Sequence, residues 1–135
     1  MLSELPTILI VEDDGSVQEI VEDALPDAGF EAAIAASGEE AVVLLNSGTA
    51  NYRGLVTDIN LKGRMDGWEV ARQARGRDPA FPVVYMSGAA ADQWASNGVP
   101  NSIMLEKPFA PAQLVTAVSQ LLNIGATNCP TGKSN

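Results

Sequence analysis

Short strand-like runs of apolar residues alternate along this chain with longer segments in which apolar residues follow helical spacing. The strand-like runs cover residues 8–11, 30–35, 55–57, 83–86 and 103–105. Five such alternations predict a parallel sheet with helices on both faces, because a helix must carry the chain back between parallel strands. With 135 residues, 46% of them hydrophobic, the chain fits one domain with its own core. The sequence therefore predicts a single doubly wound α/β domain.

The predicted domain is expected to run over residues 7–123, after an N-terminal extension at residues 1–6. Residues 124–135 are mostly small or polar, so we expect a disordered C-terminal tail there. Helical crossovers between parallel strands are nearly always right-handed, and we expect a flavodoxin-like strand order of 2-1-3-4-5. In this order the first and third strands are neighbours, and their ends face one another.

Polar residues mark several helix ends. Capping boxes are predicted at Ser16 with Glu19 and at Ser37 with Glu40, and Asp66 is predicted to cap a third helix. The segment after the fourth strand, residues 89–97, is short and rich in alanine. We expect this helix to be weakly anchored.

Each of four apolar runs ends at a reactive polar residue. Glu12, Asp13 and Asp14 follow the first run and Asp58 ends the third, while Ser87 and Glu106-Lys107 follow the last two. Open α/β sheets bind ligands beyond the carboxyl ends of their strands, where the strand order reverses. The sequence therefore predicts that carboxylates, a hydroxyl and an ammonium meet at one edge.

In these residues and their order, the chain resembles the receiver domains of two-component response regulators, over roughly residues 7–123. The resemblance implies that Asp58 accepts a phosphoryl group from a phosphohistidine on a histidine kinase or a histidine phosphotransfer protein. It implies a signalling phosphoacceptor rather than an enzyme, one that assists its own phosphorylation and dephosphorylation. The output partner is unknown.

Three ionised carboxylates close together would repel one another, and a bound divalent metal is the simplest way to offset that repulsion. Mg²⁺, or Mn²⁺ in its place, prefers oxygen ligands and commonly takes one or two carboxylates plus phosphate oxygens. Glu12, Asp13 and Asp58 are the predicted ligands, and the resemblance adds the backbone carbonyl of Asn60. Asp14 is expected to cap the first helix instead.

The resemblance also assigns the remaining polar residues at this edge. Lys107 would pair with the transferred group, and a cis bond between Lys107 and Pro108 would aim its ammonium inward. Ser87 would hydrogen-bond the transferred group and transmit the change to the next helix.

Two features of this sequence depart from the family. The loop from Asp58 to Asp66 is one residue longer than usual, and Met104 stands where many receivers carry a switching aromatic residue.

Composition excludes several other functions. The net charge of -9 argues against nucleic-acid binding, which needs clustered Lys and Arg. Residues 1–52 contain eleven Asp or Glu and no Lys or Arg, which suits a solvated face or a basic partner. The absence of histidine excludes Ser-His-Asp catalysis and His-ligated metals. One cysteine and no long apolar stretch favour the cytoplasm, with no membrane span.

Two other functions share part of this pattern. A flavodoxin-like flavin carrier needs a Ser-, Thr- and Gly-rich phosphate loop after the first strand, where Glu12-Asp13-Asp14 would repel phosphate. An aspartate-nucleophile phosphatase typically has its nucleophile in an Asp-x-Asp pattern at the same place, which these residues do not match. We therefore favour a stand-alone receiver that acts by protein contact or as a phosphorelay intermediate.

Overall fold

The computed structural model describes residues 5–48, 50–88 and 91–127, and they form one five-stranded parallel sheet in the order β2-β1-β3-β4-β5. The strands are β1 (Thr7–Val11), β2 (Glu31–Ala35), β3 (Tyr52–Asp58), β4 (Val83–Ser87) and β5 (Ile103–Glu106). The helices are α1 (Gly15–Asp27), α2 (Gly38–Ser47), α3 (Gly67–Arg77), α4 (Trp94–Asn97) and α5 (Pro111–Thr127). The predicted fold class and strand order are confirmed.

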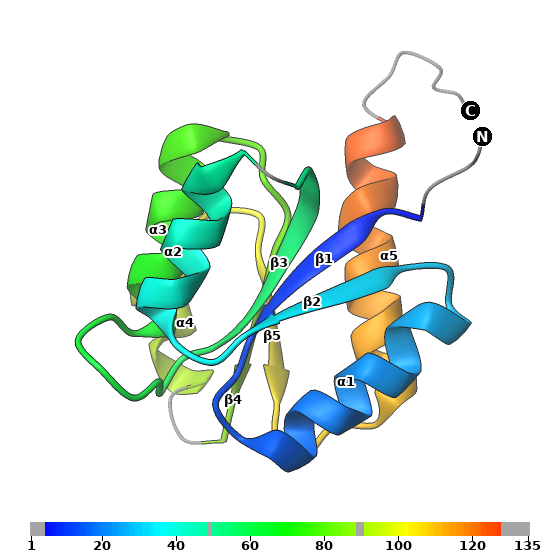
Figure 1. Cartoon of the computed structure of the whole chain (residues 1–135), viewed down its shortest axis with the longest axis horizontal. Coiled ribbons are helices and arrows are strands. Elements are labelled where there is room, and N and C mark those ends of the chain that lie inside the picture. Colours follow the sequence, from blue (N-terminus) through cyan, green and yellow to red (C-terminus); the bar gives the residue numbers. More distant parts are fainter. Residues whose placement is uncertain (1–4, 49, 89–90, 128–135) are drawn as a thin grey trace.

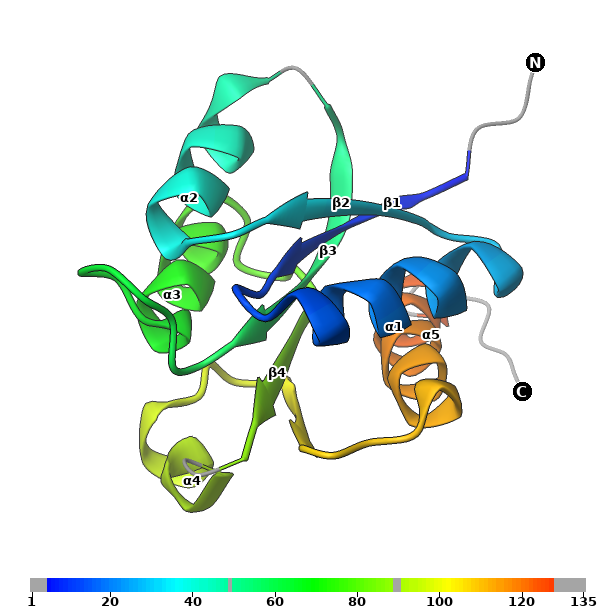
Figure 2. The same cartoon turned by 60° about the horizontal axis from the view of Figure 1, so that its bottom comes forward.

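Helices cover both faces of the sheet, as Figures 1 and 2 show. Helices α1 and α5 lie on one face, and α2, α3 and the short α4 lie on the other. Successive residues of a strand point to opposite faces, so Leu9 and Val11 belong to the α2–α3 core while Ile8 and Ile10 belong to the α1–α5 core. Burial on both faces explains why the strands read as continuous apolar runs rather than alternating ones.

The first helix starts differently from the expected capping box. Asp14 is the N-cap, and its carboxylate accepts hydrogen bonds from the backbone N–H of Ser16 at 2.9 Å and from the Ser16 hydroxyl at 2.7 Å. Ser16 is therefore already inside the helix, and the predicted box with Glu19 is wrong. The expectation that Asp14 caps the helix is confirmed. An aspartate accepts this bond as well as a serine does, so spacing alone could not choose between them.

The other two predicted caps are present. The hydroxyl of Ser37 accepts the backbone N–H of Glu40 at 3.1 Å, and the Glu40 carboxylate accepts the N–H of Ala36 at 3.0 Å. The carboxylate of Asp66 accepts the N–H of Glu69 at 3.0 Å. The bonds from Glu40 and Glu69 satisfy backbone donors in the first turn that have no partner within their helix, and the bond from Ala36 holds the residue before the Ser37 cap.

Two boundaries differ from the expected ones. Helix α5 continues through Thr127, so the residues 124–127 that were assigned to the tail are helical; residues 128–135 lie outside the described part of the chain. The predicted helix at residues 89–97 is a 3-10 turn, η1 (Ala91–Gln93), followed by the four residues of α4, all exposed; residues 89 and 90 are not described. Such exposure agrees with weak anchoring.

Candidate functional site at the carboxyl edge of the sheet

The parallel register brings the predicted site residues to one edge of the sheet. Val11 at the end of β1 pairs with Thr57, directly before Asp58, and Ser87 at the end of β4 pairs with Glu106. Each strand thus ends at the same height, and the residue that follows it enters the same space. The register therefore brings together five of the predicted residues: Glu12, Asp13, Asp58, Ser87 and Lys107.

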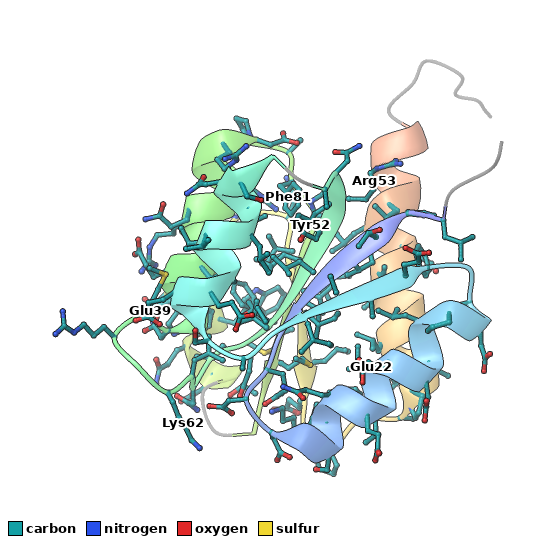
Figure 3. The ribbon with its side chains drawn as sticks, viewed as in Figure 1. Glu22, Glu39, Tyr52, Arg53, Lys62 and Phe81 are labelled. Carbon is teal, nitrogen blue, oxygen red and sulfur yellow. The ribbon has the colours of Figure 1, made fainter. Side chains whose placement is uncertain are left out.

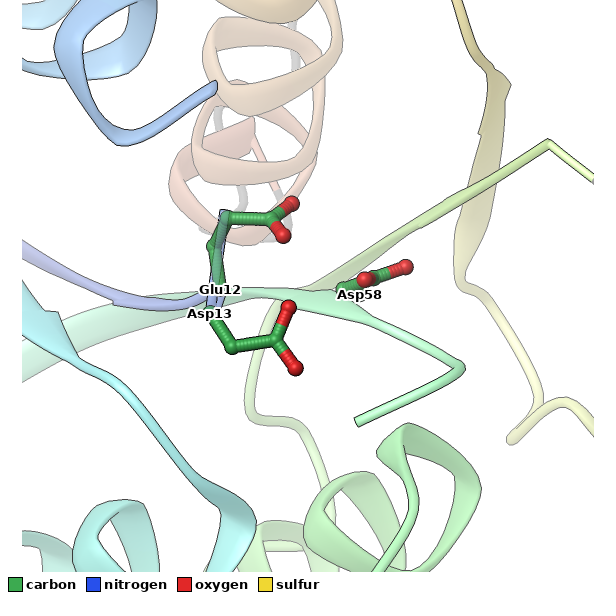
Figure 4. Close-up of side chains that lie close together, drawn as sticks. All are labelled: Glu12, Asp13 and Asp58. Atoms are coloured by element: carbon green, nitrogen blue, oxygen red, sulfur yellow. The ribbon is translucent and has the colours of Figure 1, made fainter. Parts of the chain in front are cut away.

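Three carboxylates form a tight cluster at this edge. Glu12, Asp13 and Asp58 each contribute one oxygen to a set whose members all lie within 4.8 Å of one another, and Figure 4 shows the three side chains close together. Glu12 is fully buried, Asp58 is 7% exposed, and Asp13 is half-buried toward solvent. Oxygen donors at this spacing suit a small, hard divalent cation.

Lys107 supplies the one positive charge that contacts this cluster among the described residues. Its ammonium lies 2.8 Å from a Glu12 oxygen and 3.4 Å from an Asp58 oxygen. Burial raises the pKa of Glu12; the hydrogen bond from Lys107 opposes that rise, and the negative charge of Asp58 adds to it. Burial alone would lower the pKa of Lys107, but the Glu12 hydrogen bond and the two negative charges outweigh it and raise the pKa. The ammonium thus stays charged.

Backbone contacts fix the position of Asp58. The next residue, Ile59, donates its N–H to the carbonyl of Met86 on β4 at 3.1 Å and accepts the N–H of Gly67 at 2.9 Å. Gly67 starts α3 so close to the strand end that a Cβ atom there would overlap the Asp58 carbonyl oxygen. A glycine is therefore required at this position for the helix to approach the strand.

Further hydrogen bonds hold Glu12 and Asp13 in position. The second oxygen of Glu12 accepts the N–H of Asp14 at 3.1 Å, and the Glu12 carbonyl accepts a bond from the Gln18 side chain at 2.6 Å. Asp13 accepts the backbone N–H of Lys62 at 3.1 Å. Sequence reasoning missed Gln18 and Lys62 as supporting residues; the unusual length of the loop after Asp58 was the only signal that pointed near Lys62.

The remaining predicted residues lie beside the cluster. Ser87 is fully buried, and its carbonyl accepts the backbone N–H of Lys107 at 2.9 Å. The bond from Lys107 to Pro108 is cis, as predicted. Met104 pairs with Tyr85 across β4 and β5. Asn60 is exposed in the turn after β3, and its role as a carbonyl ligand stays a prediction.

The family described as "response regulator receiver domain" matches residues 8–119. This chain therefore belongs to the response regulator receiver family, whose members are the phosphoacceptor signalling domains of two-component systems. The match, together with the acidic edge, does not favour the flavin-carrier and phosphatase alternatives.

Two solved structures of receivers are similar to this chain in sequence and in fold. A crystal structure of a response regulator receiver protein from Sinorhizobium medicae WSM419 is 54% identical, with a TM-score of 0.86 over 89% of this chain and 96% of that one. The receiver domain of the hybrid histidine kinase CckA is 30% identical, with a TM-score of 0.70 over 86% of this chain and 98% of that one.

Curated relatives are longer. The transcriptional regulatory protein PrrA of Mycobacterium tuberculosis is 37% identical over 87% of this chain and 50% of its own length. The sensor kinase CckA of Brucella abortus is 32% identical over 90% of this chain and 13% of its own length. The chain thus spans half or less of the curated relatives it matches. Across the residues described, no helix is both long and apolar enough to cross a membrane.

Proposed function

We propose that Asp58 accepts a phosphoryl group from a phosphohistidine on a histidine kinase or a histidine phosphotransfer protein. The observation that carries the proposal is the convergence of Glu12, Asp13 and Asp58 within 4.8 Å, with the Lys107 ammonium 3.4 Å from Asp58. Asp58 ends a buried strand next to a cation and two further carboxylates. That combination suits a nucleophile that works beside a bound metal.

The carboxylates of Glu12, Asp13 and Asp58, with the Asn60 carbonyl, would hold Mg²⁺ or Mn²⁺. The residues fit the ion because they offer hard oxygen donors from two chain segments, the ends of β1 and β3, and because Glu12 is fully buried. When bound, the metal supplies positive charge that offsets the charge on the phosphoryl oxygens.

The transfer itself needs little covalent machinery. A carboxylate oxygen of Asp58 forms a bond to phosphorus while the phosphorus–nitrogen bond breaks, and the electron pair of the broken bond stays on the imidazole. Lys107 offsets charge on the equatorial oxygens, which is where phosphoryl transfer gains most from electrostatic stabilisation. Hydrolysis of the same acyl phosphate by water would return Asp58 to its starting state, so the domain would also assist its own dephosphorylation.

Ser87 and Met104 would carry the signal. Ser87 lies at the end of β4, the strand next to the one that ends at Asp58, and its hydroxyl would bond the new phosphoryl group. The following segment, through η1 and α4, offers little buried surface to resist movement. Met104 is unbranched and adapts to the repacking.

The exposed face of α1 suits a basic partner. Its acidic side chains are Glu19, Glu22, Asp23 and Asp27, all exposed. Beside them Ile20 is 41% exposed, which gives this face an apolar contact as well. We propose that a kinase or phosphotransfer protein with a basic rim docks here, in the cytoplasm, and that the output is a protein contact rather than nucleic-acid binding.

The first test measures phosphorylation at Asp58. The protein is incubated with acetyl phosphate and Mg²⁺, and intact mass and peptide mapping are recorded. One phosphoryl group should appear on the parent and on Asp92→Asn, which changes an exposed aspartate outside the cluster, but not on Asp58→Asn. A gain that survives Asp58→Asn, or that persists with a chelator present, contradicts the proposal.

The second test concerns the metal ligands. Replacing Glu12 and Asp13 together by alanine should weaken Mg²⁺ binding, followed by calorimetry, and should slow phosphorylation in parallel. If the double variant loses only folding stability and binds Mg²⁺ as the parent does, the two carboxylates have a structural role alone.

A further inference from the structure

We propose that Glu39, on α2, is a positioning residue for Asp13, acting through the backbone of Lys62-Gly63-Arg64. The inference rests on the proposed role of Asp13 as a magnesium ligand. Glu39 lies outside the cluster and touches none of its members. Its influence would travel through a loop that bonds to Glu39 at one end and to Asp13 at the other.

Two hydrogen bonds define the connection. The N–H of Arg64 donates to the Glu39 carboxylate at 2.9 Å, and the N–H of Lys62 donates to the Asp13 carboxylate at 3.1 Å. Figure 3 places Glu39 and Lys62 at the same corner of the molecule, where the loop after β3 passes the start of α2. The side chains of Lys62 and Arg64 are exposed, so backbone bonds hold these two residues, while Leu61 and Met65 on either side pack against the α2–α3 core.

Two glycines show that the loop and α2 are fitted closely to each other. Gly63 has a φ of +100°, which a glycine adopts without strain, and a Cβ there would come within 2.9 Å of a Glu39 oxygen. On α2, a Cβ at Gly38 would come within 2.9 Å of the Met65 carbonyl oxygen. Both segments therefore have a glycine where the other segment approaches, which a chance contact between exposed segments would not require.

The charge on Glu39 suits this role. The hydrogen bond from the Arg64 N–H is the main cause of a lowered pKa for Glu39, so the carboxylate is ionised at neutral pH. Bonds from a backbone N–H to an ionised carboxylate are stronger than those between neutral groups. The bond between the Glu39 carboxylate and the Arg64 N–H, called the Glu39 clamp below, therefore holds the loop after β3 in place. The Lys62 N–H in that loop then fixes the rotation of the Asp13 carboxylate toward the cluster.

The test compares three variants for Mg²⁺ affinity, by calorimetry, and for amide hydrogen exchange at Lys62 and Arg64. Glu39→Ala removes the clamp. Gly63→Ala keeps every charge but displaces the Glu39 carboxylate. Glu31→Ala is the control, because Glu31 is an exposed glutamate at the start of β2, the end of the strand away from the cluster. Outer-shell partners of metal ligands typically contribute 10–100-fold to affinity, so we expect a loss of about 10-fold in the first two variants. The control should stay within about 2-fold, the change that a remote, screened surface charge allows.

The outcomes separate the possible failures. Faster exchange at Lys62 and Arg64 with unchanged Mg²⁺ affinity would overturn the inference, because the clamp would then order the loop alone. A loss in Glu39→Ala without one in Gly63→Ala would also overturn it and leave only a through-space charge effect. If the parent itself binds no Mg²⁺, the proposed function fails first. Unchanged thermal unfolding of each variant checks that the fold is intact.

Discussion

The ammonium of Lys107 lies closer to the buried carboxylate of Glu12, at 2.8 Å, than to that of Asp58, at 3.4 Å. The stronger contact thus joins the lysine to a predicted metal ligand rather than to the predicted nucleophile. Glu12 has no access to solvent, and a buried carboxylate needs a cation or hydrogen-bond donors beside it. Before phosphorylation, Lys107 therefore stabilises the acidic cluster.

Lys107→Met should destabilise the fold in the absence of Mg²⁺, because it leaves Glu12 and Asp58 facing each other without a cation. Breaking a fully buried pair costs about 3–5 kcal/mol, and the Lys107 side chain is 23% exposed, so we expect a smaller loss of about 1–3 kcal/mol. Chemical unfolding with and without Mg²⁺ measures it. The second change Glu12→Gln should restore part of the loss, and a double variant no more stable than Lys107→Met would refute this explanation.

Gly67→Ala should displace Asp58 and slow its phosphorylation. The added methyl would overlap the Asp58 carbonyl oxygen and crowd Ile59, both backbone positions, so the start of α3 must move. Overpacking of this kind costs about 1–3 kcal/mol.

Gly76→Ala is the matched control for Gly67→Ala in the same helix. Nothing lies within 4 Å of a Cβ at Gly76, so alanine there should raise stability by up to about 1 kcal/mol through helix propensity and leave phosphorylation unchanged. Equal phosphorylation rates in the two variants would show that the close approach at Gly67 does not position Asp58.

Switching should run through Ser87 to the segment that includes α4. The Trp94 indole donates to the Ser102 hydroxyl at 2.9 Å, and the N–H of Val99 donates to the buried Tyr85 hydroxyl at 3.1 Å. The second bond joins the segment to β4, the strand that ends at Ser87, and the first ties α4 to the residue before β5. On phosphorylation with acetyl phosphate, amide exchange should change across residues 91–107.

Ser87→Ala should shrink those exchange changes while Asp58 still reacts, because the hydroxyl is the proposed relay. Tyr85→Phe should raise exchange at Val99 even without phosphorylation, because it removes the acceptor of that N–H. Changes of full size in Ser87→Ala would show that the signal leaves Asp58 by another path.

Association with the phosphodonor protein should slow as salt rises. The acidic face of α1 would steer a basic partner, and salt screens such steering over a Debye length of about 8 Å at physiological ionic strength. Stopped-flow mixing of the two proteins at several salt concentrations measures the association rate. A variant with amides at Glu19, Glu22 and Asp23 should lose most of the salt dependence. A parent rate independent of salt would leave the charge with a role in solubility alone.

The Glu39 clamp should be lost in acid. The folded state lowers the pKa of Glu39 below its ordinary value, so the clamp's contribution is complete above the ordinary pKa and disappears as the pH falls through the lowered one. Arg64 is the charged residue that also favours the ionised form. In NMR spectra, the Arg64 amide should titrate with a midpoint below the ordinary pKa of a glutamate carboxyl. A midpoint at or above it would contradict the clamp.

The sequence by itself determined the fold class and the members of the site. Apolar runs with helical segments between them allow only parallel strands with crossovers, and that topology forces strand ends such as Asp58 and Ser87 to one edge. Glu12, Asp13 and Lys107 could be predicted for the same reason, since each lies within two residues of a strand end. Local spacing also predicted the caps at Ser37 and Asp66.

Tertiary structure decided what depends on distance between remote segments. No local pattern shows that Glu39 reaches the loop at Arg64, because the two residues meet only when α2 packs beside that loop. The shorter distance from the Lys107 ammonium to Glu12 than to Asp58 is likewise set by how the strand ends pack together. Sequence pattern fixes which groups share an edge; packing fixes which of them touch, because bonds and charges act over a few ångströms.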